Sequence, residues 1–158
     1  MSGYDFPYTV EQVASYEATL ATPEVIGPVP EGLRVNFYVT GGTLLGPKLK
    51  GKLRPVGADW LTIRTDGVAV LDVRATLETD DGALIYCTYD GLIDMGPDGY
   101  QNFIDGTPPP PEGIDIRITP SFQTSHPDYL WLNKAVCYGI GKGFLDQNRV
   151  CYDVYQIK

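Results

Sequence analysis

The sequence predicts an all-β protein, a single domain folded as an antiparallel, closed or nearly closed β-barrel of about eight to ten strands. Many short segments alternate apolar and polar residues, which is the pattern of strands with one buried face. Glycine (18) and proline (13) are frequent, as expected for many turns. No amphipathic pattern of helical period extends over ten residues. A two-sheet sandwich is the alternative architecture.

The clearest strands form a meander over residues 57–91. Three alternating segments there are separated by Asp66-Gly67 and by Asp80-Asp81-Gly82. Asp-Gly pairs favour tight hairpin turns, because glycine adopts positive φ without steric cost. We therefore expect three consecutive antiparallel strands, with the turns serving folding rather than chemistry.

The rest of the chain is expected to flank this meander. Residues 1–13 are predicted to form an N-terminal arm, and the glycines at positions 41, 42, 46 and 51 predict bulges or corners where the sheet bends. Residues 95–113, which include Pro108 to Pro111, are predicted to form a Pro-rich loop over one barrel end. Further strands are expected at 15–22, 34–40, 114–122, 135–140 and 149–157.

Composition excludes several classes of protein. A formal net charge of −8 disfavours contact with phosphate backbones, so nucleic acid is not an expected partner. No apolar run is long enough to span a membrane, and the first residues show no basic start with an apolar core. We expect a cytoplasmic protein.

Cysteine and histidine chemistry has little support. The three cysteines, Cys87, Cys137 and Cys151, form no Cys-x-x-Cys pair and suit reduced, packed thiols. His126 is the only histidine, in a turn beside Pro127, so neither a zinc site nor a Ser-His-Asp triad is expected. No metal and no cofactor are predicted.

The remaining candidates for chemistry are Asp, Arg and Tyr residues. Asp72 and Arg74 share one face of the middle meander strand, and we expect this polar face to line a cavity. An acid or base beside an arginine could move a proton next to a carbonyl group and stabilise the enolate. The alternative is an ion pair that fixes strand register or lies at a subunit contact. Candidate catalytic residues are Asp59, Asp72, Arg74, Tyr89 and Arg117, and candidate substrate-binding residues are Trp60, Tyr86, Phe122, Trp131 and Asn133.

The chain resembles the domain-of-unknown-function 3237 family. The motifs that carry this resemblance span much of the chain in order: Gly41-Gly42, Gly46-Pro47, Gly51, Gly57-Ala58-Asp59-Trp60, Arg64-x-Asp66-Gly67, Asp72-Val73-Arg74, Asp81-Gly82, Tyr89-x-Gly91, Arg117-x-x-Pro120-x-Phe122-x-Thr124 and Tyr129-x-Trp131-Leu132-Asn133. The resemblance implies a barrel of the allene-oxide-cyclase and dirigent type, which encloses an apolar pocket. Such barrels guide cyclisations or additions without a cofactor and usually form homo-oligomers.

Three functions remain open at this point. The first is a cofactor-independent lyase or isomerase acting on a small apolar carbonyl compound, by hydration or dehydration of a conjugated double bond or by cyclisation. Asp59 or Asp72 would be the base, Arg74 or Arg117 would hold the oxygen, and Tyr89 or Tyr86 would donate a proton. The second is a non-catalytic barrel that binds a small ligand. The third is a structural barrel filled by side chains.

Overall fold

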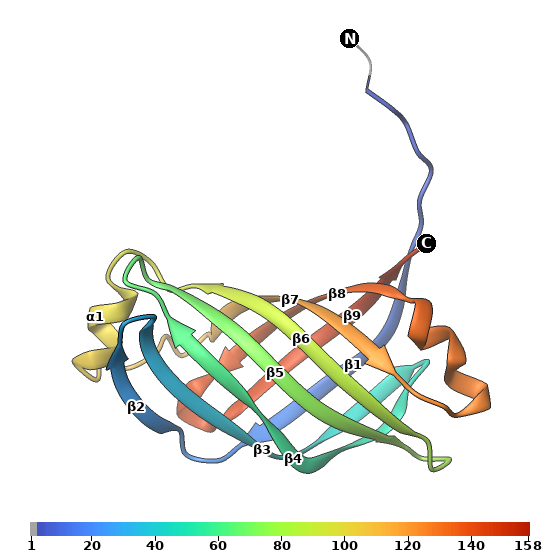
Figure 1. Cartoon of the computed structure of the whole chain (residues 1–158), viewed down its shortest axis with the longest axis horizontal. Helices are drawn as coiled ribbons and strands as arrows, with labels where there is room; N and C mark the ends of the chain where they lie inside the picture. The colour runs from blue at the N-terminus through green and yellow to red at the C-terminus, as the bar shows by residue number, and fades with distance from the viewer. Residues whose placement is uncertain (1–2) are drawn as a thin grey trace.

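The computed structural model describes residues 3–158, which form an antiparallel barrel closed by pairing of its first and third strands (Figure 1). The order around the barrel is β1-β9-β8-β7-β6-β5-β4-β3, and β2 pairs with β3 alone. The predicted closed barrel is therefore confirmed, as eight strands plus one extra. The strands are β1 Val10–Leu20, β2 Glu24–Val29, β3 Gly32–Pro47, β4 Lys50–Ile63, β5 Val68–Thr79, β6 Leu84–Asp94, β7 Ile114–Gln123, β8 Val136–Phe144 and β9 Arg149–Ile157.

Three short helices lie in the connections. The six-residue helix α1 (Gly99–Ile104) lies at one barrel end, and the 3-10 helix η1 (Pro127–Lys134) lies at the other (Figure 1). A 3-10 turn, η2 (Leu145–Gln147), joins β8 to β9. None of the helices in residues 3–158 is long and apolar enough to cross a membrane.

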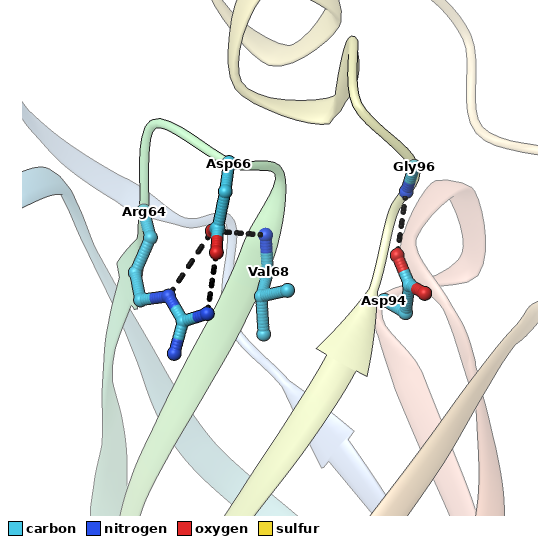
Figure 2. A network of polar contacts seen from close by, with 5 residues as sticks. All are labelled: Arg64, Asp66, Val68, Asp94 and Gly96. Carbon is cyan, nitrogen blue, oxygen red and sulfur yellow. Dashed lines mark hydrogen bonds and ion pairs between the residues drawn. The ribbon is translucent and has the colours of Figure 1, made fainter.

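The meander 57–91 is present as β4, β5 and β6. Gly67 and Gly82 both have positive φ (88° and 89°), as the Asp-Gly turns predict. At the first turn, Asp66 accepts a hydrogen bond from the Val68 backbone N–H (3.2 Å) and forms an ion pair with Arg64 (Figure 2). The turn is thus fixed by local polar contacts, in agreement with a role in folding.

The same turn anchors the segment that follows β6. The backbone N–H of Met95 donates to the carbonyl oxygen of Gly67 (3.0 Å), and the N–H of Gly96 donates to the Asp94 carboxylate (3.0 Å; Figure 2). From there, residues 95–113 run through α1 at one end of the barrel (Figure 1), where Met95 and Phe103 pack partly buried against the core.

The N-terminal arm is shorter than predicted. Residues 10–13 belong to β1, because Val10 pairs with Ile157 of β9 and the Thr9 backbone N–H donates to the Lys158 carbonyl oxygen (2.7 Å). Residues 3–8 extend away from the barrel and are exposed (Figure 1). Residues 1 and 2 of the predicted arm lie outside the described residues.

The predicted glycine corners mark places where two strands come into close contact. A side chain at Gly42 would place its Cβ 2.2 Å from the Glu17 carbonyl oxygen, and one at Gly51 would lie 2.1 Å from that of Glu78. The register of β3 against β4 also shifts between Tyr38 and Gly42. Both strands therefore bend where only glycine fits, and the bends help to close the barrel.

Candidate functional site

The barrel lumen is packed with side chains but keeps a cavity of about 40 Å³. Three of its lining residues carry polar side-chain groups, namely Asp59, Tyr89 and Tyr152. The others are apolar: Ala18, Leu20, Phe37, Val39, Leu53, Leu61, Leu71, Val73, Ala75, Ile93, Ile116, Leu145 and Val150. A second void of about 20 Å³ toward α1 is lined partly by Phe103 and Met95. A carboxyl group in such surroundings is the most unusual feature of the described chain.

Asp59 reaches the lumen through the alternation of β4. It shares the inward face with Leu61 and Ile63, and it is paired with Phe37 of β3 and Val73 of β5. Its Oδ1 accepts a hydrogen bond from the Asp72 backbone N–H (3.0 Å). The side chain is only partly exposed, and it lines the cavity.

These surroundings change the acidity of Asp59. Burial raises its pKa from 3.8 to about 7, against the opposing effect of the hydrogen bond from the Asp72 backbone. The Asp72 carboxylate on the other side of the sheet adds a smaller upward contribution. Asp59 therefore changes its protonation state near neutral pH, whereas an ordinary surface aspartate is ionised there.

Three buried tyrosines stand beside this carboxyl group in the lumen. The Tyr16 and Tyr152 rings lie 5.0 Å apart, and Tyr89 meets Tyr152 edge-on at 5.8 Å between ring centroids. Burial raises the pKa of all three phenols well above the usual value, so they stay protonated as donors. No protein group within the described residues hydrogen-bonds to the Tyr16 hydroxyl.

Strand β8 makes room for these rings. Its inward positions Gly139, Gly141 and Gly143 carry no side chain, and a Cβ on Gly141 would lie 2.4 Å from Cδ1 of Tyr152. Gly141 is paired with Tyr152 across the β8–β9 ladder. The glycine therefore leaves the space that the Tyr152 ring fills.

The expectation that Asp72 and Arg74 line the cavity is wrong. Their side chains lie on the outer surface, 52% and 51% exposed, with Arg74 Nη1 3.6 Å from Asp72 Oδ1. The inward positions of β5 are the aliphatic ones, such as Leu71 and Val73. The predicted alternation is present in β5, but its polar face contacts solvent because its apolar face fills the lumen.

Three other predicted residues also point outward. Arg117 is exposed, and its Nη1 donates to the carbonyl oxygen of its neighbour Ile116 (3.0 Å). Tyr86 is 40% exposed. Trp60 lies on the outer face of β4, where the Arg74 guanidinium stacks over its ring at 5.4 Å.

The remaining predicted residues divide between the lumen and the η1 end. Tyr89 and Phe122 are inward and 7% exposed each. Trp131 belongs to η1, with Lys48 Nζ 4.8 Å from its ring centre. Asn133 connects η1 to β7 by two hydrogen bonds with the Thr124 backbone (2.9 and 2.8 Å). Of the ten candidates, only Asp59 and Tyr89 line the cavity.

Two lumen tyrosines were missed as candidates. Tyr152 stands between Val150 and Val154 on the buried face of β9, and Tyr16 stands on the buried face of β1. The signal in the sequence was a tyrosine in place of an aliphatic residue on the apolar face of an alternating strand. Such a tyrosine carries a hydroxyl into the interior, where it needs a hydrogen-bond partner, and this marks it as a candidate.

Several features outside the lumen could hold small molecules or ions. Asp81, His126 and Asp128 bring three ligand atoms within 4.8 Å at the η1 end. However, Tyr129 already donates to both Asp81 oxygens (3.0 Å), and His126 Nδ1 accepts the Asp128 backbone N–H (3.3 Å). Sequence reasoning had treated His126 as a turn residue and did not find this cluster.

An open hollow of about 610 Å³ is lined in part by Tyr86 and Asn133. Another, of about 490 Å³, lies on the outer face of β1, β9, β8 and β7. Arg149 there lies 3.4 Å from Glu17, and Lys142 lies 3.5 Å from Asp115. Its charges are thus largely paired and in contact with solvent, which leaves the lumen as the better site for acid–base chemistry.

Comparison with known proteins identifies relatives over nearly the whole chain. Residues 8–157 match the family model described as "Protein of unknown function (DUF3237)". A UPF0311 protein of Rhodopseudomonas palustris is 36% identical over 132 residues, covering 83% of this chain and 84% of the relative. A β-barrel-like protein of Acinetobacter baumannii has a similar crystal structure (TM-score 0.82, 33% identity), covering 99% of this chain and all of that one.

A more distant crystal structure shares the fold alone. It is described as an enzyme from Penicillium herquei, and it superposes with a TM-score of 0.70 at 22% identity over the full length of both chains.

Proposed function

The chain belongs to the DUF3237 family, and we propose that its barrel lumen is an acid–base site for a small, neutral carbonyl compound. The reaction class is that of a lyase or isomerase that uses only protein side chains. Asp59 is the proton acceptor and donor, and Tyr89 donates a hydrogen bond to the carbonyl oxygen. The observation that carries the proposal is the Asp59 pKa of about 7 in an apolar lumen.

A pKa close to the operating pH is what general acid–base catalysis requires. The Asp59 carboxylate would take a proton from the carbon next to the carbonyl, leaving an enolate whose oxygen is stabilised by the Tyr89 hydroxyl. Return of that proton at a different carbon completes an isomerisation. Departure of a hydroxyl group from the adjacent carbon, with the proton returned to it as water, completes a dehydration, and the reverse is a hydration.

The cavity must enlarge before an organic substrate fits. At about 40 Å³ it has room for one or two water molecules but not for a ring compound. We propose entry at the α1 end, because Phe103 and Met95 line the adjoining void and belong to the connection rather than to the barrel wall. Displacement of α1 would join the two voids to solvent. The fold of the Penicillium herquei enzyme is compatible with a catalytic barrel.

The same small cavity favours a second candidate, a structural barrel whose lumen is filled by side chains. In that case Asp59 is only a buried carboxyl group held by the Asp72 backbone. The two candidates differ in one measurable respect. A structural barrel neither binds a carbonyl compound nor moves its protons.

Deuterium uptake by 2-cyclohexen-1-one in D2O, followed by proton NMR, tests the proposal. The native protein should accelerate exchange at the carbons adjacent to the enone, and Asp59→Asn should slow it by about 10²- to 10⁴-fold, as for loss of a general base. Asp72→Asn is the matched control, since it neutralises the carboxylate on the outer face of the neighbouring strand and should retain most of the rate. Exchange no faster than in buffer, or an Asp59→Asn variant as active as the native protein, refutes the assignment.

A further inference from the structure

The polar groups around the lumen cavity define what it can bind. Besides Asp59 they are two phenol hydroxyls, Tyr89 from β6 and Tyr152 from β9. No Lys, Arg or His side chain lines the cavity. A carboxylate or phosphate ligand would therefore lie near the Asp59 carboxylate in an apolar enclosure without a compensating cation, which is strongly unfavourable. An uncharged ligand has no such penalty.

The two phenols are arranged as hydrogen-bond donors. Both side chains are buried, 7% and 3% exposed, and their rings meet edge-on at 5.8 Å. Burial is the main cause of the raised pKa of Tyr152, and the nearby Tyr89 hydroxyl adds to it. Each neutral phenol has one proton to donate, and two donors from separate strands can converge on one oxygen with two lone pairs.

The Tyr152 ring is held in place from several sides. The Tyr16 ring packs against it in a tilted arrangement, 5.0 Å between ring centroids, and Gly141 on β8 leaves the room that the Tyr152 ring occupies. The Tyr16 hydroxyl behind it has no hydrogen-bonding protein partner within residues 3–158. Tyr16 does not line the cavity, so its part in this arrangement is to pack against Tyr152 rather than to donate to a ligand.

We propose that Tyr152 and Tyr89 together bind the oxygen of an uncharged carbonyl ligand, so that Tyr152 is a second oxygen-binding residue and the site selects neutral ketones and enones over carboxylates. The inference rests on the proposed function for the location of the site. Its binding step needs no proton transfer by Asp59. Removing either hydroxyl leaves the ring in place and should weaken binding by roughly tenfold, since it removes one of the two hydrogen bonds to the ligand oxygen.

Infrared difference spectroscopy of bound 2-cyclohexen-1-one, with a 13C-labelled carbonyl, tests this directly. In the native protein the carbonyl band should lie at lower wavenumber than in an apolar solvent, because two donors polarise the bond. Tyr152→Phe and Tyr89→Phe should each move it part of the way back. Tyr138→Phe is the matched control, since Tyr138 stacks on Tyr155 at 5.4 Å on the outer face, and it should leave the band unchanged.

Ligand charge provides the second arm of the test. Cyclohex-2-ene-1-carboxylate has a similar ring and should show at least tenfold weaker binding than the enone at pH 8.

Circular dichroism and thermal melts confirm that each variant is folded. If Tyr152→Phe does not fold, Tyr89→Phe provides the test of the carbonyl band. Failure of the enone to bind, a band at its apolar-solvent position, or equal binding of the carboxylate overturns the inference. A shifted band without deuterium exchange would retain this inference and refute the proposed catalysis. Exchange together with a band shift that depends on Tyr89 but not on Tyr152 would retain the catalysis and refute this inference.

Discussion

Replacing Asp59 by Asn should make the protein more stable at alkaline pH, because the folded lumen disfavours the ionised carboxyl group. Burial raises the Asp59 pKa from 3.8 to about 7, and each unit corresponds to roughly 1.4 kcal/mol. The folded state thus holds the proton more tightly than the unfolded state, and stability falls as pH rises from about 4 to 7. Full ionisation costs about 4 kcal/mol in total, of which about 2–3 kcal/mol is expected between pH 5 and pH 8.

The other ionisable groups discussed above contribute little to the change in stability between pH 5 and pH 8. The tyrosines that face Asp59 in the lumen have a raised pKa and stay neutral. Surface carboxyls with a lowered pKa, such as Glu11 at about 2, act at lower pH and with the opposite sign, since their contribution is lost as pH falls. The Asp59→Asn side chain keeps an oxygen that can accept the Asp72 backbone hydrogen bond.

Urea unfolding at pH 5 and pH 8 measures the effect. The free energy of unfolding of the native protein should fall by about 2–3 kcal/mol across this range relative to that of Asp59→Asn. Asp72→Asn should behave nearly like the native protein, because its carboxylate is exposed and adds only a minor contribution to the pKa of Asp59. Parallel pH profiles for the native protein and Asp59→Asn would refute the account of the lumen carboxyl.

The remaining predictions concern the barrel wall and its end. Gly57→Ala should destabilise by about 3 kcal/mol or more, because φ is positive and the new Cβ would lie 2.1 Å from a backbone oxygen; Gly82→Ala, with positive φ but open space, should cost nearer 1 kcal/mol. Ile85 is fully buried, so Ile85→Ala should lower the free energy of unfolding by about 2–5 kcal/mol. Leu84 is exposed, so Leu84→Ala should change it by no more than about 0.5 kcal/mol, and urea unfolding measures both. Phe103→Ala should speed enone association in stopped-flow binding if α1 covers the entrance, and an unchanged rate would contradict that route.

The strand pattern was predictable because it depends on local chemistry. Alternation identified β4, β5 and β6, and Asp66-Gly67 and Asp81-Gly82 identified the turns between them, since positive φ at glycine is a property of a few residues. Barrel closure through β1 and β3 depends on contacts between distant segments. It was inferred from strand number and family resemblance rather than from any single residue.

The functional side of each strand was harder to assign. Alternation shows that Asp72 and Val73 point in opposite directions, but it does not state which direction is inside. A polar face can line a lumen only if the apolar face has another place to be buried, and here the burial of apolar surface requires Val73 to face inward. Asp59 is predicted from its place at the start of a meander strand, beside Trp60, and not from its direction. The fact that Asp59, Tyr16 and Tyr152 each interrupt an apolar strand face is a signal that points to all three lumen groups.

The most direct test of an acid–base lumen is the ionisation of Asp59 itself. The 13C chemical shift of its carboxyl carbon, assigned by comparison with Asp59→Asn and followed from pH 3 to pH 9, gives the pKa without any substrate. The account predicts a midpoint near 7, as burial in the apolar lumen requires. A midpoint near 4, like that of an exposed aspartate, would contradict it.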